Sequence, residues 1–152
     1  MSTFSASISW HLGPDEEFGP DSYHRDHEWV FSGGTVLQAS ASPGYGGNGS
    51  RVNPDEAVIA ATASCHMLTF LAIAAKQRFK VVSYVDQPEG VVEKNEEGRM
   101  AITHIRLRPR VVFDGDITEE KLQRLHDSAH RNCFVANSLR SEVTIEPETS
   151  VL

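Results

Sequence analysis

The chain has 152 residues, of which 39% are hydrophobic and 23% are charged, and its formal net charge is −7. This length suits one domain with a core of its own, so we predict a single domain over residues 1–152. The composition excludes a disordered chain. The basic residues are scattered along an acidic chain, which excludes the concentrated positive surface that binding to nucleic acid requires.

The N-terminal segment MSTFSASISWHLG has no basic region, and we find no apolar run that approaches the roughly 18 to 20 residues needed to span a bilayer. We therefore expect a cytoplasmic protein that does not bind membranes. Its two cysteines, Cys65 and Cys133, lie too far apart for a zinc ribbon or a CxxC motif. A lasting disulfide is disfavoured in a reducing cytosol, so the two cysteines are inert core thiols, metal ligands or a transient redox pair.

Three short strands are predicted before the first helix. Alternating apolar and polar residues predict a strand within 5–12, and residues 27–41 contain two more strands that turn at Gly33 and Gly34. The segments 13–26 and 42–51 are rich in Gly, Pro, Ser and Asp, which is typical of surface loops.

A long helix is predicted to begin at Asn53. Asn53 is a suitable N-cap, Pro54 suits the first helical position, Asp55 and Glu56 complement the positive helix end, and Glu56 is placed for a capping box. The following segment AVIAATASCHMLTFLAIAA is apolar on nearly every side, so protein must cover most of its circumference. The pattern predicts a central core helix that carries Cys65.

The rest of the chain alternates between strands and helices. Residues 79–94 and 99–113 predict two long strands joined by the turn NEEG, and Thr118 is the predicted cap of a helix over 119–131. A short helical piece follows Cys133, and residues 141–148 alternate as a closing strand. Strands separated by isolated helices indicate an α+β fold.

The position of Cys65 allows two interpretations. A lone cysteine in an apolar helix is most often a small hydrophobic side chain, and burial raises its pKa and makes it inert. However, the second cysteine, Cys133, lies just after one predicted helix and at the start of the next. Helix N-termini stabilise thiolates and lower the pKa of a thiol, which favours a functional pair.

The motifs NPDEAVIAATASC, which ends at Cys65, and CFVANSL, which begins at Cys133, resemble those of the OsmC/Ohr hydroperoxide reductases in residue type, order and spacing. The resemblance covers almost the whole chain. It implies an OsmC-like fold, with antiparallel sheets around a buried helix, and an intertwined homodimer with active sites at the subunit interface. The implied activity is the thiol-dependent reduction of organic and inorganic hydroperoxides, without a cofactor.

The resemblance implies that Cys65 is the peroxidatic cysteine and Cys133 the resolving one. The residue types agree with this chemistry, because a thiolate that attacks a peroxide becomes a sulfenic acid, and a second thiol condenses with it to a disulfide. A dithiol reductant then restores both thiols.

Members of the family hold an arginine with a carboxylate to stabilise the thiolate. The carboxylate position is Asp55 here, where relatives have glutamate, and Glu56 is the alternative. Ten residues separate Asp55 from Cys65, a rise of about 15 Å in a helix, so the two cannot meet within one helix. We therefore expect the partner subunit to complete the Cys65 site.

Two arginines in the loops before the helix can provide the cation. Arg25 leads into a strand beside Asp26 and Glu28, whereas Arg51 lies so close to the helix start that it is also typical of a solvated loop charge. The sequence favours Arg25.

The histidines support an alternative function. His66 replaces the aromatic residue that often follows the cysteine in relatives, and it is either a satisfied core histidine or a base for Cys65. His126, His130 and Cys133 form an H-x3-H-x2-C pattern that can place three metal ligands on one helical face. The alternative is therefore a non-enzymatic metal- or small-ligand-binding OsmC-like protein. Because no fourth ligand is recognisable, we favour the peroxidase and expect no metal.

Aromatic side chains are the last candidates for a substrate site. They either pack in the core or line an apolar entry for an alkyl peroxide, and the candidates are Trp10, Tyr23, Trp29, Phe31, Tyr45 and Phe70. Tyr45 is the best candidate for a role outside the core, because its glycine-rich loop cannot easily bury a ring.

Overall fold

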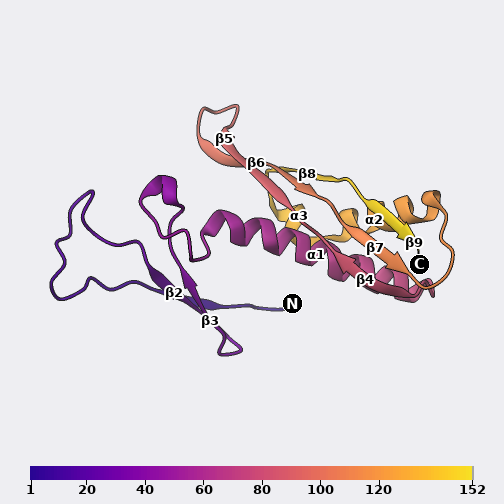
Figure 1. The fold of residues 1–152 in the computed structure, drawn as a ribbon, viewed down its shortest axis with the longest axis horizontal. Coiled ribbons are helices and arrows are strands. Elements are labelled where there is room, and N and C mark those ends of the chain that lie inside the picture. The colour runs from indigo at the N-terminus through magenta and orange to yellow at the C-terminus, as the bar shows by residue number, and fades with distance from the viewer. Residues whose placement is uncertain (152) are drawn as a thin grey trace. The chain divides into compact units, whose positions relative to one another are not determined.

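The structure, a computed structural model, describes the backbone of residues 1–151 and the side chains of residues 1–148. Its helices and strands confirm the α+β class (Figure 1). The chain contains two compact units, Met1–Ala57 and Val58–Leu152. That the whole chain forms a single domain stays a prediction.

The first unit contains one antiparallel sheet with the strand order β1-β2-β3. Its strands are β1 (Ala6–Ser9), β2 (His27–Phe31) and β3 (Val36–Ala39). The turn between β2 and β3 lies at Gly33 and Gly34 as predicted; Gly34 has a φ of 83°, which glycine adopts without strain, and its N–H donates to the Phe31 carbonyl at 2.8 Å. The predicted loops are confirmed, and the second contains the short 3₁₀ helix η1 (Pro43–Tyr45).

Helix α1 (Pro54–Lys76) begins where the sequence predicts. The Asn53 side chain accepts a hydrogen bond from the Glu56 N–H at 2.9 Å, and the Glu56 carboxylate accepts one from the Asn53 N–H at 3.0 Å. This reciprocal capping box satisfies two N–H groups that the helix itself leaves unpaired. It also occupies the Glu56 carboxylate, which weakens Glu56 as the alternative to Asp55.

The apolar character of α1 exceeds our expectation. By length and composition alone α1 is able to cross a membrane, so the expectation that the chain has no such apolar run was wrong. Core helices of soluble proteins have the same properties. However, only 28% of the apolar stretch of α1 is buried, and Leu68 is 61% exposed. Much of the apolar surface that we expected to be covered therefore lies exposed.

The second unit contains two three-stranded sheets, with the orders β5-β6-β8 and β4-β7-β9. Their strands are β4 (Val81–Val85), β5 (Glu89–Lys94), β6 (Met100–Leu107), β7 (Arg110–Phe113), β8 (Glu142–Ile145) and β9 (Glu148–Val151). The pairs β5·β6 and β4·β7 are antiparallel, as the two arms of a hairpin must be.

Each predicted strand of this unit is divided in two. The breaks fall at Pro88, Pro109 and Pro147, one in each arm of the hairpin and one in the closing strand. Proline lacks the N–H that a ladder needs and restricts the residue before it, so three paired strands all change sheet near a proline. The prediction of unbroken strands was wrong for this reason.

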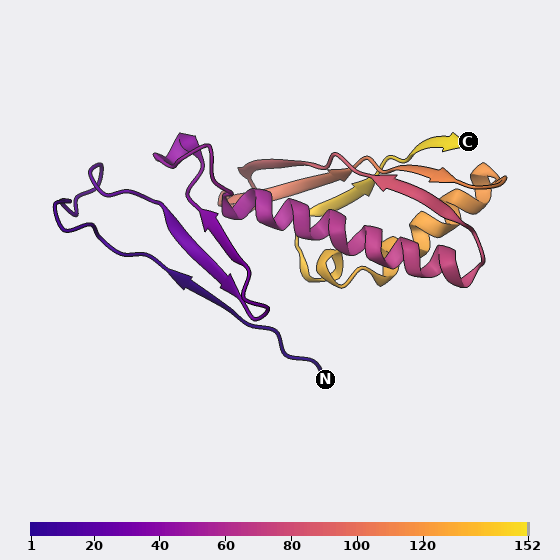
Figure 2. The same ribbon diagram turned by 60° about the horizontal axis from the view of Figure 1, so that its bottom comes forward.

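Two helices connect β7 to β8. They are α2 (Glu119–Asn132), whose cap Thr118 accepts a hydrogen bond from the Lys121 N–H at 3.3 Å, and α3 (Phe134–Ser138). Because this helical connection returns the chain to the same end of the sheet, β8 pairs with β6, and β9 with β7, in parallel. Figure 2 shows α1 and α2 on one face of the sheets of this unit.

The main core cluster joins α1, β7 and α2, and its buried members are Phe70, Ala74, Val111, Phe113, Leu122, Leu125 and Ala129. Phe70 has no exposed surface.

We expect Phe70→Ala to lower the free energy of unfolding by about 3–5 kcal/mol, since it removes buried apolar area and leaves a cavity. Urea unfolding followed by circular dichroism measures this. The matched control Phe134→Ala, at a side chain that is 82% exposed, is expected to change the free energy by less than about 0.5 kcal/mol.

Candidate functional site

The two cysteines lie together in the second unit, although they are distant in sequence. Both are free thiols; Cys65 is half-buried on α1, and Cys133 is fully buried beside it at the N-cap of α3. The Cys133 sulfur accepts a hydrogen bond from the Ala136 N–H at 3.4 Å, and its thiol donates weakly to the Thr62 carbonyl at 4.0 Å. The structure therefore brings together the two thiols that the sequence pairs.

The electrostatics of Cys133 differ from our expectation. Burial raises the pKa of the Cys133 thiol to about 11; the Ala136 N–H lowers this pKa, and the neighbouring Cys65 raises it. The predicted position at a helix start is confirmed, but the predicted lowering of the pKa is wrong, because the N–H groups of a five-residue helix do not offset the burial. Cys133 is thus a neutral thiol that has to lose its proton before it can act as a nucleophile.

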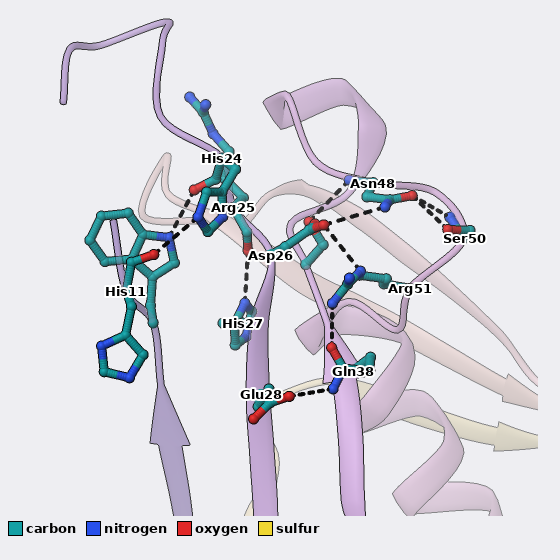
Figure 3. Close-up of polar contacts among 12 residues, drawn as sticks. His11, His24, Arg25, Asp26, His27, Glu28, Gln38, Asn48, Ser50 and Arg51 are labelled. Carbon is teal, nitrogen blue, oxygen red and sulfur yellow. Dashed lines mark hydrogen bonds and ion pairs between the residues drawn. The ribbon is translucent and has the colours of Figure 1, made fainter. Parts of the chain in front are cut away.

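The candidate arginines lie in the first unit, where each has different partners. The Arg51 guanidinium lies 3.1 Å from the Asp26 carboxylate and donates to Gln38 (Figure 3). Burial raises the pKa of Asp26, but hydrogen bonds from Ser40 and Asn48, together with the charge of Arg51, outweigh it and hold this pKa below its ordinary value. Arg51 is therefore the partner of Asp26, and the carboxylate that we placed beside Arg25 serves Arg51 instead.

Arg25 and Asp55 both line a cavity of about 490 Å³ in the first unit. The Arg25 guanidinium lies over the Tyr23 ring at 4.1 Å and donates to the Tyr23 carbonyl and, at 3.0 Å, to the Pro20 carbonyl. Within the described part of the chain, no ion pair joins Arg25 to Asp55. The cavity thus combines one cation, one carboxylate and a wall that is mostly apolar.

Aromatic rings make up much of that wall. Trp10, Tyr23 and Tyr45 line the cavity as the sequence allowed, whereas Trp29 lies on β2 outside it. Phe18 also lines the cavity, with its ring centroid 5.0 Å from that of Tyr23. The sequence analysis missed Phe18, although an aromatic residue in a Gly- and Pro-rich loop is the same signal that drew attention to Tyr45. Phe31 belongs to β2, and Phe70 belongs to the core of the second unit.

His66 and His126 form a buried pair between α1 and α2. His66 Nε2 lies 3.1 Å from His126 Nδ1, each residue is 1% exposed, and the ring planes differ by 3°. The ring centroids are 5.4 Å apart. For two rings joined by this nitrogen–nitrogen contact, the centroids are that far apart only when both nitrogens lie on the line between the ring centres. The rings are therefore coplanar and end to end, joined by one N–H···N hydrogen bond. The sequence analysis named both residues but not their pairing.

This pairing also bears on the metal hypothesis. His126 lies on the same face of α2 as Leu122, Leu125 and Ala129, with its Nδ1 bonded to His66. Among the residues that the structure describes, no three His, Cys, Asp or Glu side chains are placed to hold a metal ion. The geometry therefore gives His126, His130 and Cys133 no support as a ligand set.

The buried histidines make stability depend on pH. Burial lowers the pKa of each ring to about 4. The charge of His130 lowers the pKa of His66 further. The charge of His66 lowers the pKa of His126 further, whereas the charge of Asp127 raises it. The unfolded chain takes up these protons near its ordinary pKa of about 6.5, whereas the folded chain does not. The free energy of unfolding should therefore fall as the pH drops from about 6.5 to about 4, by up to about 3 kcal/mol per histidine.

Urea unfolding at about pH 7.5 and about pH 4.5 measures this fall. Carboxylates also titrate at the lower pH, so the fall in the free energy of unfolding has to be compared between wild type and His126→Asn. We expect the variant to lose roughly half of the histidine contribution. Equal falls in both proteins would contradict a neutral buried pair.

Comparison with known proteins gives consistent matches. Residues 47–148 match the family model described as OsmC-like protein. The solved structure of an OsmC-like protein of unknown function from Vibrio cholerae is 44% identical, with a TM-score of 0.95 over 97% of this chain and 100% of that chain. The uncharacterized protein YmaD of Bacillus subtilis is 25% identical over 80% of this chain and 83% of that protein. An organic hydroperoxide resistance protein from Elizabethkingia anophelis is 18% identical, and its TM-score of 0.70 over 100% of this chain and 98% of that chain shows a shared fold.

Proposed function

Because this chain belongs to the OsmC-like protein family, with an OsmC-like fold, we propose that it is a thiol-dependent peroxidase that reduces organic and inorganic hydroperoxides. Proteins named for organic hydroperoxide resistance share its fold. The observation that carries the proposal is the nearness of two reduced thiols, since Cys65 lies close enough to Cys133 to raise the pKa of its thiol. A merely structural cysteine in an apolar helix needs no second thiol beside it.

The proposed reaction has two steps. The Cys65 thiolate attacks the terminal peroxide oxygen, so that the O–O bond breaks and Cys65 becomes a sulfenic acid. The leaving alkoxide takes up the proton that the Cys65 thiol released on ionisation and becomes an alcohol. The Cys133 thiol then attacks the Cys65 sulfur; an S–S bond forms, and the hydroxyl group leaves as water with the proton of the thiol. A dithiol reductant outside the protein returns the disulfide to two thiols.

The first step needs a cation near Cys65, and we assign this role to Arg25, with Asp55 as its carboxylate. Both line the apolar cavity, where an alkyl hydroperoxide has aromatic surface to contact and a guanidinium to bind its oxygens. Arg51 already neutralises Asp26, and the Glu56 carboxylate caps α1. The contacts of the described residues therefore favour Arg25 and Asp55 over the alternatives.

We further propose that the protein works as a homodimer in the cytoplasm. Asp55 and Cys65 lie on one helix, about 15 Å apart along its axis, so a second copy has to supply the Asp55 that serves a given Cys65. The exposed apolar surface of α1, with Leu68 61% exposed, gives that copy a surface to bury. If the partner subunit completes the site, its Asp55 can lie near Cys65 although the Asp55 of the same helix cannot.

Thiol counting tests the proposal. The fully reduced protein is treated with cumene hydroperoxide, and the remaining thiols are counted with a chromogenic disulfide reagent. We expect one equivalent of peroxide to remove both thiols and to give one intramolecular Cys65–Cys133 disulfide, identified by mass spectrometry of a proteolytic digest. Retention of both thiols would contradict the peroxidase, and a metal kept through dialysis would then favour the binding protein.

A further inference from the structure

His27, the half-buried first residue of β2, lines the cavity of Arg25 and Asp55 but has no role in the mechanism above. Tyr23, Arg25 and His27 follow one another at every second position and all line this cavity. The residues between them line a smaller pocket instead, which His27 borders as well. Because the side chains of an extended chain alternate between two faces, His27 and Arg25 lie on the same face. The cavity therefore holds an imidazole beside the cation and the carboxylate.

A single hydrogen bond fixes which ring nitrogen of His27 can exchange a proton. Nδ1 lies 2.8 Å from the Arg25 carbonyl oxygen (Figure 3). A carbonyl oxygen only accepts hydrogen bonds, so Nδ1 carries a hydrogen, and Nε2 is the nitrogen that gains or loses the second proton. Within the described part of the chain, no hydrogen bond or ion pair occupies Nε2. Nε2 can therefore give a proton to a molecule bound in the cavity.

The other charged groups near the cavity have different tasks. An arginine keeps its proton throughout the pH range in which proteins work, so Arg25 stabilises negative charge without neutralising it. We assign Asp55 to hold that cation, which requires the ionised carboxylate. On the other face of the chain, Asp26 is engaged by Arg51 at 3.1 Å. Among the described side chains that line the cavity, only His27 carries a group of the type that exchanges protons near neutral pH.

The first step of the proposed reaction needs such a proton. When the Cys65 thiolate breaks the O–O bond of an alkyl hydroperoxide, the departing alkoxide is a strong base and a poor leaving group. A guanidinium stabilises the charge of the alkoxide, but only a proton donor removes this charge while the bond breaks. General acids typically accelerate such steps by about 10²–10⁴-fold.

We propose that His27 is the general acid of this step and donates its Nε2 proton to the departing oxygen. The S–O bond forms from a lone pair of the thiolate, the O–O bond breaks with its electron pair on the alkoxide, and the Nε2 proton converts the alkoxide to an alcohol. His27 is left neutral and takes up from solvent the proton that the Cys65 thiol released on ionisation. The inference rests on the proposed function, since it assigns a further catalytic residue to the same reaction.

The test compares two peroxides that differ in their need for this proton. Cumene hydroperoxide loses an alkoxide, whereas 3-chloroperoxybenzoic acid, which also has one aromatic ring, loses a carboxylate that is stable without a proton. His27→Asn keeps an N–H donor near the Nδ1 position for the Arg25 carbonyl but lacks Nε2. His27→Gln is the second variant, with an amide near the Nε2 position. His11→Asn is the matched control, because His11 lines the smaller pocket but not the cavity.

Each substitution is made in a Cys133→Ser background, in which the first step is measured alone, and thermal unfolding establishes that the proteins fold. Rapid-quench mixing with one equivalent of peroxide at pH 7, followed by dimedone, gives the rate of sulfenic acid formation at Cys65. We expect both His27 variants to react about 10²-fold more slowly with cumene hydroperoxide, and less than about threefold more slowly with the peroxyacid. Arg25→Met should slow both reactions, since it removes the cation that stabilises the thiolate. His11→Asn should slow neither.

Equal losses with both peroxides would overturn the role of His27, since a merely structural role does not depend on the leaving group. An unchanged rate with cumene hydroperoxide would overturn it as well. In both cases Cys65 still forms the sulfenic acid when His27 is present, so the proposed function stands. A Cys65 that reacts with neither peroxide in the presence of His27 would overturn the proposed function and the role of His27 together.

Discussion

The Cys65→Ser protein is expected to lose hydroperoxide consumption entirely, whereas Cys133→Ser is expected to keep the first reaction and lose the second. A serine hydroxyl does not form the sulfenic acid on which the cycle depends, so the loss at Cys65 should be on the order of 10³-fold or more. Without Cys133, the sulfenic acid at Cys65 has no thiol beside it and is oxidised further by excess peroxide. The two substitutions remove equally many thiols but give different products.

Intact-mass spectrometry after a short exposure to cumene hydroperoxide distinguishes these products. We expect no added oxygen on Cys65→Ser, one added oxygen trapped by dimedone on Cys133→Ser, and the loss of two hydrogens on the wild type. If Cys133→Ser and Cys65→Ser both resist oxidation, or both take up oxygen equally, the two thiols do not have the separate roles proposed here.

The elements of this fold follow closely from local signals in the sequence. The capping box at Asn53 and Glu56, the cap Thr118 and the glycine turn at Gly34 are each decided by a few neighbouring residues, so pattern and composition suffice to predict them. The strand breaks at Pro88 and Pro109 were equally local signals, but we gave more weight to the long apolar runs around them. Which strand pairs with which, and the parallel return of β8, depend on contacts between distant parts of the chain.

The candidate site shows the same division. Cys65 and Cys133 stood out because two motifs at a fixed spacing point to them. The ion pair of Arg51 with Asp26 was missed, because Asp26 is next to Arg25 in the sequence but meets Arg51 from the loop after β3. The histidine pair was hidden for a similar reason, since sixty residues separate His66 from His126 and nothing in the sequence indicates the register in which α1 and α2 pack. The net pKa of Cys133 depends on burial, which a motif does not reveal.

If the partner subunit completes the site, two inactive variants should restore activity when mixed. Arg25→Met should lower kcat/KM for cumene hydroperoxide by about 10²–10³-fold, because it removes the cation that stabilises developing negative charge. Cys65→Ser is inactive for a different reason. In a heterodimer of the two chains, one site combines the Cys65 of the first chain with the Arg25 of the second, and the other site lacks both groups. Denaturing and refolding an equal mixture gives about half heterodimers, and therefore about one quarter of the wild-type activity.

The recovered activity distinguishes a site completed by the partner subunit from a site formed within one chain. If Arg25 served the Cys65 of its own chain, every site in the mixture would lack one of the two groups and no activity would return. Mixing Arg25→Met with Asp55→Asn provides the matched control, because these side chains line the same cavity of one unit and should fail to complement each other. An Arg51→Met protein should retain most of its activity and instead lose stability, because it leaves Asp26 without its cation. Recovery to about one quarter in the first mixture, with none in the second, would require that each Cys65 works with the cavity of the other subunit.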